Sequence, residues 1–123
     1  MNYRLEHVAI YCEDINLAAK SYQELFGGEV TEVRTAGAPA YPFCFVKIPG
    51  EGSIQLCESK ELTGVHHYGF VADNLEQAAK EFKAKGAKIQ RESHDSKGKL
   101  TAVFLLDPTG IQVEIRQRDD TSN

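Results

Sequence analysis

The chain has 123 residues, of which 41% are hydrophobic and 26% are charged, and its formal net charge is −4. A chain of this length folds as one domain that buries roughly two thirds of the surface exposed by its unfolded form. Nucleic acids and anionic membranes are disfavoured as partners, because both are bound through basic surfaces. No apolar run approaches the ~20 residues of a membrane span, and we expect a cytoplasmic protein.

The first half of the chain has the pattern of a strand, a helix and three further strands. Alternation in residues 5–12 places Val8, Ile10 and Cys12 on one face and His7 on the other. Asp14 is a plausible helix N-cap and Gly27 a stop. The apolar stripe between them consists of Ile15, Ala18, Ala19, Tyr22 and Phe26. Three strands are predicted after the helix, at residues 29–34, 41–48 and 53–57.

The second half repeats this order. A strand is predicted at residues 67–72, and Asn74 begins a helix that stops at Gly86. The apolar stripe of that helix consists of Leu75, Ala78, Ala79 and Phe82. Strands are predicted at residues 88–92, 101–106 and 111–116. The turn sequences PGEG and DPTG precede the last strand of each half.

The two halves also align residue by residue, which indicates a tandem duplication. At an offset of 60, His7 matches His67 and the apolar positions of the two helices coincide. After one deletion the offset is 59, and Phe45 then matches Phe104. We therefore predict an α+β protein made of two βαβββ modules, residues 3–59 and 64–118, within a single domain of residues 1–123.

Four side chains that can donate a lone pair occupy two pairs of equivalent positions. On the last strand of each module the apolar residues share one face, so that Gln55 and Glu114 point to the other. The duplication aligns Gln55 with Glu114, as it aligns His7 with His67. Polar residues that gather in this way on the faces turned from the apolar packing predict a functional site.

Two imidazoles, one amide oxygen and one carboxylate form a donor set without a thiolate. This set disfavours a closed structural zinc site and favours a six-coordinate Ni²⁺, Co²⁺, Mn²⁺, Fe²⁺ or Zn²⁺ with open positions, which indicates catalysis. His66, the neighbour of His67, points to the opposite face of its strand. We expect His66 to pack on the helix side with Tyr68 and Phe70.

A family pattern runs through the segments LEHVAIYCEDINLAAKSYQELFG, SIQLCE, GVHHYGFVADNLEQAAKEFKAKGAKI and FLLDPTGIQVEI. It resembles the vicinal oxygen chelate superfamily, which includes glyoxalase I, methylmalonyl-CoA epimerase, fosfomycin-resistance enzymes, extradiol dioxygenases and bleomycin-binding proteins. The resemblance implies a cupped eight-stranded mixed sheet with the helices outside and one divalent metal within. It implies that His7, Gln55, His67 and Glu114 bind this metal, and that the substrate chelates it through two neighbouring oxygens.

The resemblance favours a metal-dependent lyase or isomerase of the glyoxalase I or methylmalonyl-CoA epimerase type. Glu114 is then the candidate catalytic base, which moves a proton at a carbon next to the chelated carbonyl. The order His, Gln, His, Glu is that of the epimerases, whereas bacterial-type glyoxalase I has Glu at the position of Gln55. At the position of the second glutamate of the epimerases, this chain has Cys44. At the two positions through which glyoxalase I holds glutathione, this chain has Tyr11 and Ser59.

Two other classes stay open. His7, His67 and Glu114 alone would form the facial triad of a non-haem iron dioxygenase or of a fosfomycin-type resistance transferase. A metal-free, ligand-sequestering protein of the bleomycin-resistance type is the third possibility. In each case the partner is a small molecule.

Three further expectations concern assembly, thiols and aromatic residues. Exposed sheet edges in such modules favour a homodimer. The three cysteines are odd in number and form no CxxC pair, so we expect reduced thiols. Tyr41 and Phe43 could line the ligand groove, but we expect them in the core, because aromatic residues in strands are more often buried than functional.

Overall fold

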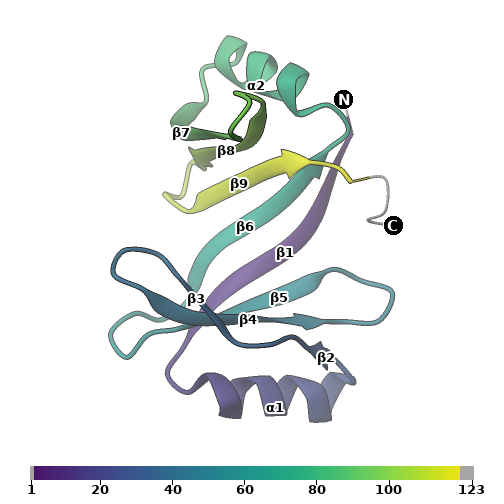
Figure 1. The fold of residues 1–123 in the computed structure, drawn as a ribbon, viewed down its shortest axis with the longest axis vertical. Helices are drawn as coiled ribbons and strands as arrows, with labels where there is room; N and C mark the ends of the chain where they lie inside the picture. The colour runs from purple at the N-terminus through teal and green to yellow at the C-terminus, as the bar shows by residue number, and fades with distance from the viewer. Residues whose placement is uncertain (1, 120–123) are drawn as a thin grey trace. The chain divides into compact units, whose positions relative to one another are not determined.

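A computed structural model describes residues 2–119. Within them the chain forms two helices and nine strands (Figure 1). These residues divide into two compact units, an N-terminal unit of residues 7–66 and a C-terminal unit that combines residues 2–6 with residues 67–119. No helix within residues 2–119 is long and apolar enough to cross a membrane.

The N-terminal unit contains one helix and a set of strands in the order β2-β4-β5-β1. The bounds are β1 (Tyr3–Cys12), α1 (Ile15–Phe26), β2 (Glu29–Val30), β3 (Arg34–Ala36), β4 (Tyr41–Lys47) and β5 (Ser53–Glu58). β5 pairs with β4 in antiparallel and with β1 in parallel orientation, and β3 pairs with β4. The residues of β1 before His7 belong to the C-terminal unit.

The strand predicted at residues 29–34 is divided into β2 and β3. Its ladder with β4 is altered at Thr31, whose hydroxyl oxygen accepts the backbone N–H of Phe45 at 2.9 Å, while the N–H of Thr31 donates to the carbonyl of Phe45 at 2.9 Å. A side chain thus takes the place of a backbone carbonyl at this point. This division accounts for nine strands where the sequence predicted eight.

Helix α1 begins and ends where its capping residues predict. The Asp14 carboxylate accepts the N–H of Leu17 at 3.1 Å, and Gly27 takes the left-handed conformation, with φ of 69°, that ends the helix. The helix packs on one face of β4 and β5 (Figure 1). The core between them consists of Ile15, Ala19, Cys44, Val46 and Leu56.

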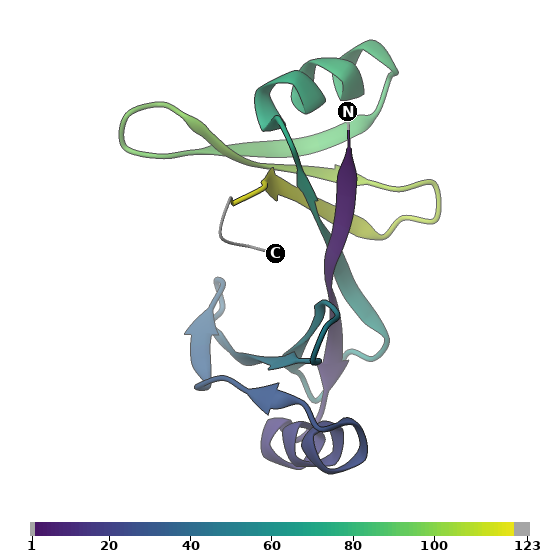
Figure 2. The same cartoon turned by 90° about the vertical axis from the view of Figure 1, so that its right-hand side faces the viewer.

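The C-terminal unit repeats this arrangement with the strand order β6-β9-β8-β7. The bounds are β6 (Val65–Ala72), α2 (Leu75–Ala84), β7 (Lys88–His94), β8 (Leu100–Leu106) and β9 (Gln112–Gln117). Asn74 caps α2 by accepting the N–H of Gln77 at 3.0 Å. Figure 2 shows α2 on one side of the β7–β8 hairpin. The core there consists of Ala72, Leu75, Ala78, Ala79, Leu100, Val103, Val113 and Ile115.

Equivalent strands of the two modules also pair in the same register. Phe45 lies opposite Gln55 in the first module, and Phe104 lies opposite Glu114 in the second. The predicted α+β fold with two βαβββ modules is therefore confirmed, and the duplication extends to the hydrogen-bonded partners of individual residues.

Candidate metal centre

The N-terminal unit places His7 and Gln55 on neighbouring parallel strands. Ala9 of β1 lies opposite Gln55 of β5, and His7 precedes Ala9 by two residues, so that all three side chains share one face. This face is opposite the one that packs on α1. His7 is 4% and Gln55 8% exposed, and within residues 2–119 they are the two buried polar residues. Buried polar side chains are rarely left without a partner, so this pair indicates a site and not general surface polarity.

The C-terminal unit places His67 and Glu114 in the same relation. Gly69 of β6 lies opposite Glu114 of β9, and His67 precedes Gly69 by two residues. Both side chains are half-buried. Because Gly69 has no side chain, no side chain of β6 lies directly opposite the Glu114 carboxylate.

Arg116 is the cationic neighbour of Glu114. Its Nε lies 3.8 Å from a Glu114 carboxylate oxygen, and its guanidinium pairs with Glu6 on β1. Burial lowers the pKa of Arg116 from its ordinary value. A guanidinium group is a permanent cation in proteins. The Glu114 carboxylate is therefore held beside a fixed positive charge.

Three of the four predicted ligands, His7, His67 and Glu114, have side chains of the kinds that could hold a metal ion. Two imidazoles and one carboxylate, without a thiolate, are the donors preferred by first-row divalent cations in catalytic sites. The amide oxygen of Gln55, next to His7 in its own unit, stays a predicted fourth ligand.

The ring of His7 is oriented by an aromatic neighbour. Phe45 of β4 meets it edge to face, with ring centroids 5.9 Å apart and the planes at 89°. This edge-to-face arrangement is favoured by the ring quadrupoles.

The structure corrects the predicted surroundings of His66. Its ring contacts the rings of Tyr11 and Tyr41, at centroid distances of 5.1 and 5.8 Å. Tyr68 and Phe70, by contrast, pack on the core beneath α2. His66 therefore belongs to an aromatic cluster of the N-terminal unit, and burial lowers its pKa.

Two cysteines near the predicted site are buried thiols. Cys44, at the position of the epimerases' second glutamate, is fully buried and lies in the core beneath α1, so it does not share the face of Gln55. Cys57 shares that face but is 1% exposed, and burial, with smaller contributions from Cys12 and Cys44, raises its pKa to about 12. Neither thiol is suited to act as a base at neutral pH.

Aromatic side chains of β4 were expected in the core, with a place in the ligand groove as the alternative. Tyr41 and Phe43 were expected in the core, but they are half-buried and lie outside the core beneath α1, which receives Cys44 and Val46 instead. The signal in the sequence was the segment YPFCFV, in which both alternating faces are apolar.

Comparison with known proteins gives a family and several relatives. The family model of the Glyoxalase/Bleomycin resistance protein/Dioxygenase superfamily matches residues 4–115. A probable chloroplastic lactoylglutathione lyase of Arabidopsis thaliana is 28% identical over 96% of this chain and 37% of its own length. A lactoylglutathione lyase of Schizosaccharomyces pombe is 25% identical over 97% of this chain and 49% of its own length. The chain thus spans half or less of the curated relatives that it matches.

A solved structure of Streptomyces coelicolor methylmalonyl-CoA epimerase, in complex with 2-nitronate-propionyl-CoA, has the same fold. The TM-score is 0.70 with 23% sequence identity, over 93% of this chain and 96% of the epimerase. At this identity the likeness shows the fold alone.

Proposed function

Since the chain belongs to the Glyoxalase/Bleomycin resistance protein/Dioxygenase superfamily, we propose that it is a metal-dependent lyase or isomerase of the glyoxalase I or methylmalonyl-CoA epimerase type. The proposed reaction is proton transfer at a substrate carbon. This carbon lies next to a carbonyl group whose oxygen is one of the two that chelate the metal. The observation that carries the proposal is that each unit places two lone-pair donors on one strand face, His7 with Gln55 in the N-terminal unit and His67 with Glu114 in the C-terminal unit.

The proposed donor set leaves the centre with a net positive charge. His7 and His67 bind as neutral imidazoles, Gln55 as a neutral amide, and Glu114 supplies the single negative charge. A bound divalent cation would polarise the substrate carbonyl and stabilise the enolate that forms when the neighbouring carbon loses its proton. A set with one carboxylate favours this anionic species more than a set with two, because less of the cation's charge is neutralised.

Glu114 is the group proposed to take and return the proton. Its carboxylate is half-buried, and no side chain lies opposite it on β6, where Gly69 is its partner. Arg116 beside it stabilises the anionic form of the carboxylate and, with Glu6, restricts its position. Cys44 is buried in the core beneath α1, so the proposal assigns the proton transfer to one carboxylate and not to a pair of bases.

The substrate class and the assembly follow as further parts of the proposal. The substrate is a small α-hydroxy or α-keto carbonyl compound that offers two neighbouring oxygens. The two modules act as one domain, and a homodimer and a cytoplasmic location stay predictions. The metal is Ni²⁺, Co²⁺, Zn²⁺, Mn²⁺ or Fe²⁺.

Metal content and isotope exchange test this proposal. We expect about one divalent metal per chain in the purified protein, lost in His67→Ala and kept in the matched variant His94→Ala, since His94 is exposed. Deuterium wash-in at the α-carbon of a hydroxy- or keto-carbonyl substrate, under anaerobic conditions with Ni²⁺ or Co²⁺, would support proton transfer. Activity that requires Fe²⁺ and oxygen would assign the same triad to a dioxygenase, and absence of metal would leave a ligand-binding protein.

A further inference from the structure

A continuous row of aromatic rings leads away from the candidate ligand His7 along β4. Phe45 contacts His7, Phe43 contacts Phe45 at a centroid distance of 6.1 Å, and Tyr41 contacts Phe43 at 6.5 Å. We call Tyr41, Phe43 and Phe45 the aromatic strip. All three rings are half-buried, so each keeps surface that a ligand can cover.

The aromatic strip is not part of the hydrophobic core beneath α1. The alternate residues of β4, Cys44 and Val46, are fully buried there, and the strip lies on the other face of the same strand. Opposite it on β5, Gln55 pairs with Phe45, and Cys57 pairs with Phe43.

Within residues 7–11, 41–45 and 53–57, the strands β1, β4 and β5 include no carboxylate, ammonium or guanidinium group. The charged neighbour of the aromatic strip is the exposed Arg34 of β3, which lies opposite Phe43. An apolar planar group that lies against Phe43 and Phe45 would be covered by their rings.

The second module shows that the fold does not require these rings. The equivalents of Tyr41 and Phe43 are Leu100 and Ala102, both 6% exposed. The equivalent of Phe45, Phe104, is covered by the guanidinium of Arg91, which lies 3.8 Å from the ring centroid. The same strand is thus built with one aromatic ring in the second module and with three in the first, where Tyr41 also contacts the ring of His66.

From these contacts we propose that the substrate carries an aromatic group next to its two chelating oxygens, and that this group stacks on Phe43 and Phe45. The inference rests on the proposed metal centre. Phe45 contacts His7, a proposed metal ligand, so the rings lie near the two substrate oxygens that would chelate the metal. Stacking and burial of a phenyl group on two rings strengthen binding by about tenfold to a hundredfold.

Two hydroxamates test the proposal, since both chelate a metal through neighbouring oxygens and differ in one substituent. Acetohydroxamate and benzohydroxamate are titrated calorimetrically into protein loaded with Ni²⁺ or Co²⁺. We expect benzohydroxamate to bind at least tenfold more tightly, after correction for the affinity of each compound for the free ion. Phe43→Ala should remove most of this preference, measured as the ratio of the two affinities.

Matched variants separate stacking from other effects. Phe43→Leu, which keeps an apolar side chain, should lose part of the preference, and Phe26→Ala, at an exposed ring of α1, should lose none. Acetohydroxamate binding without a preference for the aromatic compound would overturn the inference and leave the proposed function standing. A protein that binds no metal would overturn both. If Phe43→Ala changes the mass of the assembly in sedimentation and not the ratio of affinities, the strip is a contact between two copies of the chain, and the inference is wrong.

Discussion

Glu58 and Gln117 occupy equivalent positions at the ends of β5 and β9, and each accepts a hydrogen bond from the first backbone N–H of its module's helix. The Glu58 carboxylate accepts from Ile15 at 3.1 Å, and the Gln117 amide oxygen accepts from Leu75 at 2.8 Å. The first N–H groups of a helix have no partner within the helix, so each last strand satisfies one of them. The duplication has kept this bond although a carboxylate stands in one copy and an amide in the other.

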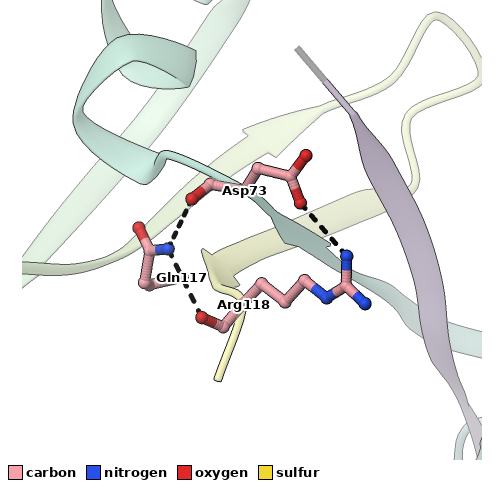
Figure 3. Close-up of polar contacts among 3 residues, drawn as sticks. All are labelled: Asp73, Gln117 and Arg118. Atoms are coloured by element: carbon pink, nitrogen blue, oxygen red, sulfur yellow. Dashed lines mark hydrogen bonds and ion pairs between the residues drawn. The ribbon is translucent and has the colours of Figure 1, made fainter. Parts of the chain in front are cut away.

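The amide of Gln117 makes a second bond that a carboxylate could not make. Its Nε2 donates to the backbone carbonyl of Asp73 at 2.7 Å, and Arg118 pairs with the Asp73 carboxylate at 3.4 Å (Figure 3). The start of α2 is thus fixed to the end of β9 through both the donor and the acceptor of one side chain.

Removal of the Gln117 amide, with its bonds to Leu75 and Asp73, should destabilise the fold measurably. We expect Gln117→Ala to lower the free energy of unfolding by about 1–2 kcal/mol, because the N–H of Leu75 and the carbonyl of Asp73 lose their partner. Gln90→Ala, at an exposed residue of β7, should have an effect within about 0.5 kcal/mol. Urea unfolding followed by circular dichroism measures both, and equal effects of the two variants would contradict the assignment.

The equivalent bond in the first module predicts a graded result. Glu58→Ala should destabilise the protein by about 1 kcal/mol, whereas Glu58→Gln should cost less, because the amide oxygen still accepts the N–H of Ile15. The remaining difference between Glu58 and Gln measures the attraction of a negative charge to the helix N-terminus, about 0.3–1 kcal/mol at low salt. High salt should therefore remove most of the effect of Glu58→Gln and only part of that of Glu58→Ala, which also loses the hydrogen bond.

The buried thiols should be unreactive in the folded protein. Burial raises the pKa of Cys57 to about 12 and also raises the pKa of Cys44, so that almost no thiolate is present at pH 8. We expect Ellman's reagent to leave both thiols unmodified in the native protein and to react with all three cysteines in urea. Mass spectrometry of digested protein assigns the sites, and rapid native modification of Cys57 would show that it has a lowered pKa instead.

The helices and most strands could be predicted because their signals are local. Asp14 and Asn74 cap their helices through bonds to residues three positions away, and Gly27 ends α1 through its own conformation. The pairing of candidate ligands also followed from the sequence, because a duplication transfers the face and register of one strand to its copy.

The rest depended on contacts between residues far apart in the chain. The division of β2 from β3 comes from the bond between Thr31 and Phe45, and the position of His66 comes from Tyr11 and Tyr41. The faces of β4 could not be told apart by periodicity, since both are apolar. The smaller Cys44 and Val46 pack under α1, which leaves the aromatic rings on the face of Gln55.

The turn before β9 should contribute a stability that depends on pH. The Asp107 carboxylate accepts hydrogen bonds from the Thr109 hydroxyl at 2.6 Å and from the N–H of Ile111 at 2.9 Å, and these bonds lower its pKa below the usual value of 3.8. A carboxyl group with a lowered pKa in the folded state stabilises that state above its unfolded pKa, and this contribution is lost as the pH falls through the folded pKa.

We therefore expect Asp107→Ala to lower the urea midpoint at pH 7, and the difference from the unmodified protein to shrink as the pH falls below about 3.8. Glu51→Ala, at an exposed residue of the equivalent turn in the first module, should leave the midpoint unchanged at both pH values. A difference for Asp107→Ala that is the same at neutral and at acidic pH would show that the turn needs the side chain but not its charge.

The two roles proposed for Glu114, metal ligand and base, can be separated with one pair of variants. Glu114→Gln keeps an oxygen donor in the same position, as Gln55 already does on β5, but removes the group that takes the proton. Metal should still bind at saturating concentration, while deuterium exchange at the substrate carbon falls by about 10²–10⁴-fold. Gln55→Glu is the matched control, because it adds a carboxylate at the equivalent position and leaves Glu114 intact.

Gln55→Glu should bind the metal at least as tightly, because a carboxylate replaces an amide, and should keep exchange within about tenfold of the unmodified protein. If Glu114 served only as a ligand, exchange in Glu114→Gln would follow metal occupancy and return at saturating metal. Exchange that stays low in fully loaded Glu114→Gln, with normal exchange in Gln55→Glu, identifies the carboxylate on β9 as the base. Equal loss in both variants would instead assign the effect to the charge of the centre.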